Sequence, residues 1–289
     1  RLENDALALL LGGQSVLDFD GSSVKVSIHQ FHGIEYNDFA CRVAQTALWI
    51  AENQMLRETE ALLHRNLDFL PLKTYSGIVE GNALRIDWAT LAPHFDYIIG
   101  NPPFVGGKMM NAEQKEDMLR VFGKKWKNLG NMDYVCCWYK RAADLMRGTE
   151  TKTALVSTNS ITQGQAVASL LGPLLDSGVH IDFAHRTFQW DSESNLKAHV
   201  HVVIVAFSCG KDDGKRKPLF DGDRFNLVPN INGYLLPAPG ITIDNRTRAL
   251  CPVPQMDFGN MPNDGGNLLL SPEEREAVLR DEPALASVI

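Results

Sequence analysis

Hydrophobic residues recur along the chain at two different spacings, which separate helices from strands. Apolar residues that return every three or four positions predict helices over 2–11, 38–55, 111–122, 132–147 and 163–176. Short apolar runs bounded by turn residues predict strands over 15–19, 24–28, 77–81, 95–99, 152–157, 179–184 and 199–207. Strands that alternate with helices indicate an α/β fold with a mainly parallel, doubly wound sheet.

The helical pattern stops after about residue 210. A charged stretch over 211–217 is followed by a segment rich in Pro, Asn and Gly, and the next capped helix begins at Ser271. This final segment is too short and too rich in loops to bury a core of its own. We therefore expect a first domain over 1–215 and the start of a second domain over 216–289.

The composition is that of a globular protein. Hydrophobic residues make up 44% and charged residues 22%, which excludes a disordered chain, and no apolar run is long enough to predict a membrane span. The net charge of −7 argues against a basic nucleic-acid coat but leaves room for a local basic groove. The five cysteines form no C-x-x-C pair, so we expect reduced thiols of the cytoplasm rather than disulfides or a zinc site.

The tetrapeptide Asn101-Pro102-Pro103-Phe104 directly follows the predicted strand 95–99. A plain turn is one interpretation, but the carboxyl ends of parallel strands are also where α/β sheets bind ligands. The Asn101 side-chain oxygen and the Pro102 carbonyl could accept the two hydrogens of an amine and so make a delocalised nitrogen more nucleophilic. The prolines fix this geometry, because each restricts its own φ and the residue before it. Phe104 adds a flat face for a planar substrate.

This motif resembles the catalytic motif of the amino-directed, S-adenosylmethionine-dependent DNA methyltransferases. The resemblance implies a methyltransferase fold and direct displacement of a methyl group from a sulfonium, with positioning as the main catalytic contribution. The segment 31–35 resembles the second motif of this family, which implies that Glu35 binds the ribose hydroxyls of the cofactor. Otherwise Glu35 is a surface residue before a helix.

The segment Gly81-Asn82-Ala83-Leu84 resembles the third motif of the same family. The resemblance implies that Asn82 and Ala83 contact the cofactor adenine. Many members have Asp at this position, but an Asn oxygen can also accept a hydrogen bond from the adenine amine. A simple Gly-Asn turn, or Asp87 in the cofactor role, are the alternatives.

Three longer runs, 156–165, 183–190 and 259–268, are similar to the modification half of type IIL restriction-modification enzymes. Those single chains fuse nuclease, methyltransferase and target-recognition parts. The resemblance implies double-stranded DNA as partner, a recognition domain after about residue 215, and a possible fused nuclease outside this chain. It also implies that Phe188 packs against a target base flipped out of the helix. Trp190 is the alternative, and Phe188 could instead be a core aromatic.

The family's first motif, a Gly-rich turn that cradles the methionine part of the cofactor, has no good counterpart. The segment 16–22 imitates its opening but contains no Gly-x-Gly, and too few residues separate Gly21 from Glu35 to form a crossover helix and the next strand. We therefore expect the first motif to precede Arg1, so that the chain lacks the central strand of the sheet.

Basic residues are concentrated over 105–131 and include Lys108, Lys115, Arg120, Lys124, Lys125 and Lys127. They could line a DNA groove or form a solvated helix face with ion pairs. His199 and His201 share one strand face but have no third ligand nearby in the sequence, so we predict no metal site.

The leading hypothesis is therefore methylation of adenine N6 in duplex DNA, using S-adenosylmethionine, within the restriction-modification system of a bacterial or archaeal cell. Cytosine N4, RNA amines and protein glutamine are alternative substrates, because the same acceptors suit their amines. A third hypothesis is an inactive fragment that only presents a fold or binds DNA weakly. In that case we expect little binding of S-adenosylmethionine, because the Gly-rich turn is missing.

Overall fold

The computed structural model describes residues 1–11, 25–63, 77–190, 200–212, 214–244, 251–253 and 269–287. The chain divides into two compact units, Arg1–Asp244 and Asn245–Ile289. No helix within the described ranges is both long enough and apolar enough to cross a bilayer.

The first unit begins with two helices and a small parallel sheet. Helices α1 (Leu2–Leu11) and α2 (Asp38–Leu63) confirm the predicted helices, although α2 is longer than expected. Strand β1 (Gly33–Glu35) pairs in parallel with β2 (Ile78–Glu80), which confirms the strand predicted over 77–81. The two helices are joined through Asn4, which accepts a hydrogen bond from the Thr59 hydroxyl at 2.7 Å.

Of the two strands predicted near the amino terminus, only part of the second can be compared with the structure. The strand over 15–19 and residue 24 lie outside the described residues. The prediction is wrong for 25–28, because Ile28–Gln30 forms a 3-10 turn. The Ser27 backbone N–H donates to the Gln30 side chain at 2.8 Å, so local hydrogen bonds replace strand pairing there.

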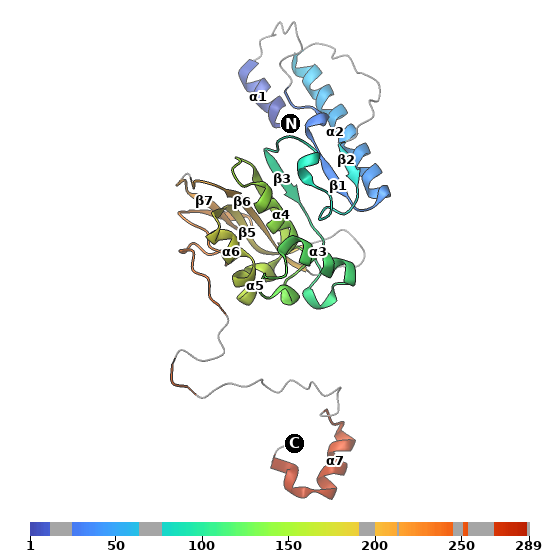
Figure 1. The fold of residues 1–289 in the computed structure, drawn as a ribbon, viewed down its shortest axis with the longest axis vertical. Coiled ribbons are helices and arrows are strands. Elements are labelled where there is room, and N and C mark those ends of the chain that lie inside the picture. Colours follow the sequence, from blue (N-terminus) through green and yellow to red (C-terminus); the bar gives the residue numbers. More distant parts are fainter. Residues whose placement is uncertain are drawn as a thin grey trace. The chain divides into compact units, whose positions relative to one another are not determined.

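A second sheet of six strands forms the centre of this unit (Figure 1). Its order is β3-β4-β6-β5-β7-β8, with β3 (Tyr97–Gly100), β4 (Lys152–Thr158), β5 (Val179–Trp190), β6 (Val200–Cys209), β7 (Lys217–Asp221) and β8 (Arg224–Val228). The pairings make β3, β4, β5 and β7 run in one direction, whereas β6 and β8 run against them. The predicted α/β class is confirmed.

Strand β3 differs from the prediction in its exposure. An apolar run of this kind is typical of a buried strand, but Tyr97 is 73% exposed and Ile99 is 82% exposed. Because β3 is the last strand of its sheet and successive side chains point to opposite faces, only Ile98 packs against the core. One face of this strand is therefore open.

Helices α3 (Ala112–Phe122) and α4 (Cys136–Leu145) confirm the helices predicted over 111–122 and 132–147, although α4 is shorter. The helix predicted over 163–176 is interrupted at Leu170 and forms α5 (Gly164–Ser169) and α6 (Leu171–Asp176). The interruption has a clear cause, because Pro173 has no N–H to donate to the carbonyl of Ser169. That carbonyl instead accepts the Trp126 indole N–H at 2.7 Å.

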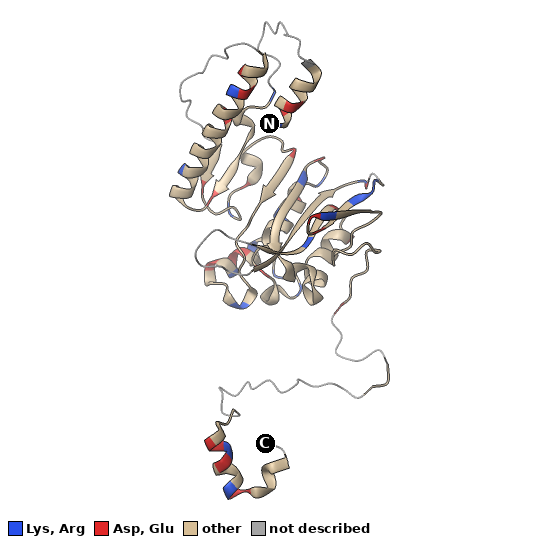
Figure 2. Cartoon of the chain, turned by 180° about the vertical axis from the view of Figure 1, so that it is seen from behind, with Lys and Arg blue, Asp and Glu red and all other residues tan. Residues whose placement is uncertain are grey.

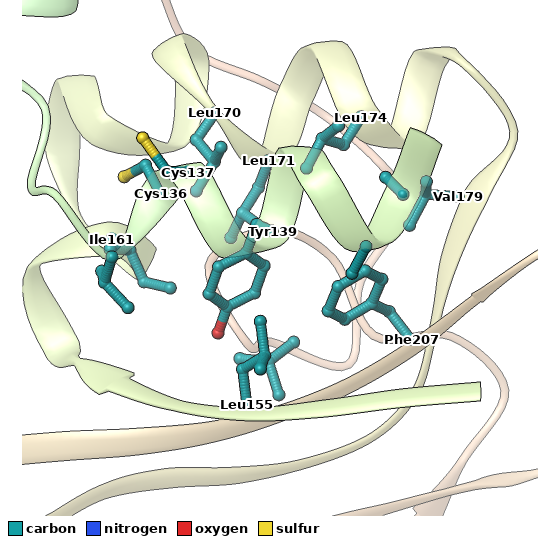
Figure 3. Close-up of a cluster of buried hydrophobic side chains, with 14 of the residues drawn as sticks. Cys136, Cys137, Tyr139, Leu155, Ile161, Leu170, Leu171, Leu174, Val179 and Phe207 are labelled. Atoms are coloured by element: carbon teal, nitrogen blue, oxygen red, sulfur yellow. The ribbon is translucent and has the colours of Figure 1, made fainter. Parts of the chain in front are cut away.

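The core lies between α4 and the six-stranded sheet. The ring of Tyr139 on α4 is fully buried and stacks on Phe207 of β6 with centroids 5.2 Å apart. Figure 3 shows Tyr139 pointing toward Leu155 on β4, and its hydroxyl pairs with Ser157 at 2.6 Å. This contact attaches α4 to the strand next to β3.

All five cysteines are free thiols in this structure. Cys41, Cys136 and Cys137 are buried, Cys209 is half-buried and Cys251 is exposed. Burial raises the pKa of the thiols of Cys136, Cys137 and Cys209 above the ordinary value.

The second unit contains helix α7 (Pro272–Asp281), which begins at the predicted capping box. The Ser271 hydroxyl accepts the Glu274 N–H, and the Glu274 carboxylate accepts the Ser271 N–H. Figure 2 shows acidic and basic residues together on this helix, and none of its residues is buried.

Candidate active site

The loop Asn101-Pro102-Pro103-Phe104 leaves β3 at its carboxyl end. Asn101 and Pro103 are exposed, whereas Pro102 is buried. The Phe104 side chain is half-buried and packs against the main hydrophobic core. The loop is therefore anchored on one side and open to solvent at the Asn101 amide.

Asp133 and Tyr134 hold the backbone that follows this loop. The Asp133 Oδ1 accepts the N–H groups of Val105 at 3.1 Å and Val135 at 3.0 Å. The Tyr134 N–H donates to the Val105 carbonyl at 2.9 Å, so both polar backbone groups of Val105 are satisfied. The Thr158 hydroxyl at the end of β4 reaches the Asp133 Oδ2 at 3.4 Å. Neither Asp133 nor Tyr134 was singled out from the sequence.

The segment after the loop also lies very close to a neighbouring backbone. A Cβ added at Gly107 would lie 2.4 Å from the Gly130 carbonyl oxygen and 3.0 Å from that of Met132. A side chain at Gly107 would therefore push apart the two backbone segments that support the loop.

Glu35 and Asn82, the predicted cofactor residues, lie next to each other in the small sheet. Glu35 is the last residue of β1 and pairs with Glu80 of β2. The Gly81 N–H donates to the Glu35 carbonyl at 2.8 Å, and Asn82 follows directly. Parallel strands thus place the exposed Glu35 carboxylate and the half-buried Asn82 amide at the same edge.

The turn that begins at Asn82 is closed by its own hydrogen bonds. The Asn82 carbonyl accepts the N–H groups of Arg85 at 2.9 Å and Ile86 at 3.1 Å, and its side-chain Oδ1 accepts the Leu84 N–H at 2.9 Å. The Ala83 carbonyl accepts the Trp88 indole N–H at 2.7 Å. Asn82 and Ala83 therefore lie in a fixed backbone conformation.

Two further contacts involve residues that flank this turn. Arg141 of α4 donates to the Ile86 carbonyl at 2.8 Å, and its guanidinium lies 5.7 Å from the centre of the Trp88 ring. Asp87, the alternative cofactor residue, accepts the Ala89 N–H at 3.2 Å and caps the short 3-10 helix over Trp88–Thr90. Its side chain thus has a local structural role.

Asp117 of α3 is a fully buried carboxylate beside the Asn82 turn. It accepts hydrogen bonds from Asn82 Nδ2 at 2.9 Å, Arg85 Nε at 2.8 Å and the Tyr134 hydroxyl at 2.8 Å. Burial alone would raise the pKa of Asp117, but these hydrogen bonds lower it below its ordinary value. Burial and the bond to Asp117 also raise the pKa of Tyr134.

The sequence did contain a signal for Asp117. At helical spacing it shares a face with Met118 and Val121, so an acidic residue occupies the side of α3 that turns toward the core. Its acidic neighbours Glu113 and Glu116 are half-exposed or more and form ion pairs with Arg85.

Phe188 lies on β5, at the same end of the sheet as the loop. The register places Gly100 level with Ala184, and Phe188 level with Thr158 further toward the carboxyl edge. Because β4 and β6 separate β3 from β5, Phe188 is about 14 Å across the sheet from β3. The Phe188 ring lies between His185 at 4.7 Å and Trp190 at 6.4 Å, measured between ring centroids. Phe188 and Phe104 therefore lie at the same end of the sheet but are not in contact with each other.

The basic residues over 105–131 are all exposed. Arg120 forms an ion pair with Glu116 at 3.2 Å, as expected of a solvated helix face. His199 lies outside the described residues, and no group of three or more His, Cys, Asp or Glu among the described residues could hold a metal ion.

The sequence of the chain matches a known family of proteins. Residues 3–221 match the model of the MmeI DNA-methyltransferase domain, and residues 237–289 match that of the MmeI target recognition domain. The chain is 41% identical over 266 residues to DNA methyltransferase A of Bacillus subtilis (strain 168), which covers 90% of the chain and 30% of that protein.

A solved structure is also similar over almost the whole chain. It is the type IIL restriction-modification enzyme MmeI in complex with DNA, with a TM-score of 0.82 and 34% identity. The match covers 99% of this chain and 40% of that protein. The chain therefore spans well under half the length of either relative.

Proposed function

The chain belongs to the MmeI family of DNA methyltransferases, and from this premise we propose that it transfers a methyl group from S-adenosylmethionine to adenine N6 in duplex DNA. The observation that most supports this proposal is the loop 101–104, which ends a parallel strand with an exposed Asn101 amide on a fixed backbone. In this proposal the reaction is the modification step of a restriction-modification system in the cytoplasm of a bacterial or archaeal cell.

The residues of the loop act on the amine of the target base. The Asn101 side-chain oxygen and the Pro102 carbonyl accept its two hydrogens, which draws the nitrogen lone pair out of the ring and toward the methyl group. The N–CH₃ bond forms as the S–CH₃ bond of the cofactor breaks, which would leave neutral S-adenosylhomocysteine, and the nitrogen then loses one proton to solvent. Catalysis comes mainly from orientation, and Asp133 contributes because it fixes the backbone next to the loop.

The donors and acceptors at β1 and β2 fit a nucleoside. The exposed Glu35 carboxylate can accept both ribose hydroxyls, and Asn82 with Ala83 faces the adenine. When bound, S-adenosylmethionine supplies a methyl group on a positively charged sulfur that is a good leaving group.

The target base must leave the DNA stack to reach Asn101. We assign one stacking face to Phe104 and a second to Phe188, with Trp190 as the alternative. The carboxyl ends of β3 and β5 lie at the same end of the sheet, which supports this assignment.

The remaining assignments extend this proposal to the whole protein. Residues 1–215 form the catalytic part and residues from 216 onward lead into the recognition part, which contacts duplex DNA. Among the described strands β3 pairs only with β4, and this open edge supports a first-motif strand beside it. A fused nuclease is also part of the proposed full-length enzyme.

Methylation of duplex DNA by the full-length protein tests this function. Asn101→Ala is expected to lower kcat at least about 100-fold while cofactor affinity and Tm stay unchanged. Asn226→Ala, an exposed Asn on β8, is the matched control and should keep full activity. An Asn101→Ala enzyme with wild-type activity would refute the assigned site.

The product identifies the substrate. Digestion of the methylated DNA and mass spectrometry of its nucleosides should give N6-methyladenine. N4-methylcytosine would instead assign cytosine. Methylation of a glutamine-containing peptide, with none of duplex DNA, would replace the proposal by protein methylation.

A further inference from the structure

Asp117 stands out because a completely buried carboxylate is costly unless several donors satisfy it. Its donors come from two segments far apart in the sequence: the turn after β2, with Asn82 and Arg85, and the segment before α4, with Tyr134. Tyr134 also holds the Val105 carbonyl beside the catalytic loop. One buried group thus joins the cofactor side of the site to its methyl-transfer side.

An ionised carboxylate accepts hydrogen bonds and donates none. The Asn82 amide must therefore turn its NH₂ group toward Asp117, as the distance of 2.9 Å between Nδ2 and Oδ2 records. The Asn82 side-chain Oδ1 then faces the other way, where it accepts the Leu84 N–H at 2.9 Å and keeps a second lone pair.

We infer that Asp117 is a positioning residue that sets the Asn82 amide so that its oxygen accepts a hydrogen bond from the amino group of the cofactor adenine. This inference rests on the proposed function, in which Asn82 faces that adenine. It explains how a neutral Asn can serve where related enzymes have Asp. The buried Asp117 carboxylate disfavours the flipped orientation of the Asn82 amide, in which the Asn82 NH₂ group would face the adenine amine.

The test measures how strongly the protein prefers a cofactor analogue with the adenine amine over one without it. A merely structural role of Asp117 would not change this preference. Binding of S-adenosylhomocysteine and of S-inosylhomocysteine, which has an oxygen in place of the amine, is measured by titration calorimetry with the full-length protein. The wild type should bind the adenine compound at least about tenfold more tightly, since a mismatched polar pair costs that much or more. Asp117→Asn should reduce this ratio to within about threefold of one.

A gentler pair of variants covers the case in which Asp117→Asn fails to fold. Tyr134→Phe removes one donor to Asp117 and should weaken S-adenosylhomocysteine binding about fivefold. Tyr139→Phe removes an equally buried hydroxyl that pairs with Ser157 and should leave cofactor affinity unchanged. Glu113→Gln, which removes an exposed partner of Arg85, should also leave affinity unchanged.

The outcomes separate the two proposals. If the wild type does not distinguish the two compounds, the assignment of Asn82 to the cofactor adenine fails and this inference falls with it. If the wild type distinguishes them and a folded Asp117→Asn protein keeps the same ratio, only the positioning role is overturned. For an unfolded Asp117→Asn protein, wild-type affinity in Tyr134→Phe overturns that role in the same way.

Discussion

Replacing Asp133 with alanine is expected to impair methyl transfer because it removes the acceptor that holds Val105 next to the catalytic loop. Two backbone N–H groups, those of Val105 and Val135, bond to the same Asp133 oxygen. Asp133→Asn is the matched variant. It keeps an oxygen at the Oδ1 position and changes only the atom near Thr158, whose hydroxyl can accept as well as donate.

The magnitude follows from the two lost bonds. Hydrogen bonds to a charged acceptor contribute about 1.5–3 kcal/mol each when they are buried. Asp133 is only half-buried, so water replaces part of each bond, and we expect a total of about 2–3 kcal/mol. If this loss is fully expressed in the transition state, kcat falls about 30- to 160-fold. Asp133→Asn should lose less than about fivefold.

The assay is single-turnover methylation of duplex DNA at saturating cofactor, together with thermal unfolding of the same samples. Asp133→Ala should also lower Tm by about 5–10 °C, because the lost bonds support the native backbone. A folded Asp133→Ala protein with wild-type kcat would refute the role of Asp133 in holding the loop. Equal losses in both variants would instead assign the effect to the charge.

Three further predictions concern packing, base stacking and pH. Gly107→Ala should lower both Tm and kcat because its Cβ would meet the Gly130 carbonyl at 2.4 Å, whereas Gly106→Ala, with no atom within 4 Å, should be close to wild type in both assays. Phe188→Ala should weaken capture of the flipped base about tenfold, measured by 2-aminopurine fluorescence in the target duplex, and a larger loss in Trp190→Ala would assign the stacking to Trp190 instead. Because the pKa of Asp117 is lower in the folded protein than in the unfolded chain, its ionised carboxylate contributes to the free energy of unfolding. This contribution is complete above about pH 4, the pKa of Asp in the unfolded chain, and is lost as the pH falls toward the lower pKa in the folded protein. Urea midpoints at about pH 6 and pH 3.5 should therefore differ less in Asp117→Asn than in the wild type, and equal differences would contradict this linkage.

The strand and loop that contain Asn101 could be predicted from the sequence because both signals are local. An apolar run followed by Asn-Pro-Pro needs no knowledge of distant partners. The interruption of the helix at Leu170 was also visible in principle, since Pro173 cannot bond to Ser169. The hairpin of β7 and β8 was missed, although Gly222-Asp223 is a turn pair typical of two-residue hairpins.

The support of the site could not be read in the same way. The role of Asp117 depends on donors from Asn82, Arg85 and Tyr134, which only the fold brings together. The exposure of Tyr97 and Ile99 depends on the position of β3 at the end of its sheet, which the apolar run does not reveal. The catalytic and cofactor roles of the motif residues stay predictions until the variants are assayed.

The different exposure of the cysteines offers a route to site-selective labelling. Thiolates react with maleimides, so the buried or half-buried thiols with raised pKa on α4 and β6 should react slowly near neutral pH. Cys251, the exposed thiol, lies in the second compact unit. Cys41 is buried as well. A single fluorophore could therefore be attached at Cys251, within the region that matches the target recognition domain, without a cysteine-free background. Its energy transfer to labelled DNA would test the proposed contact of this region with the duplex.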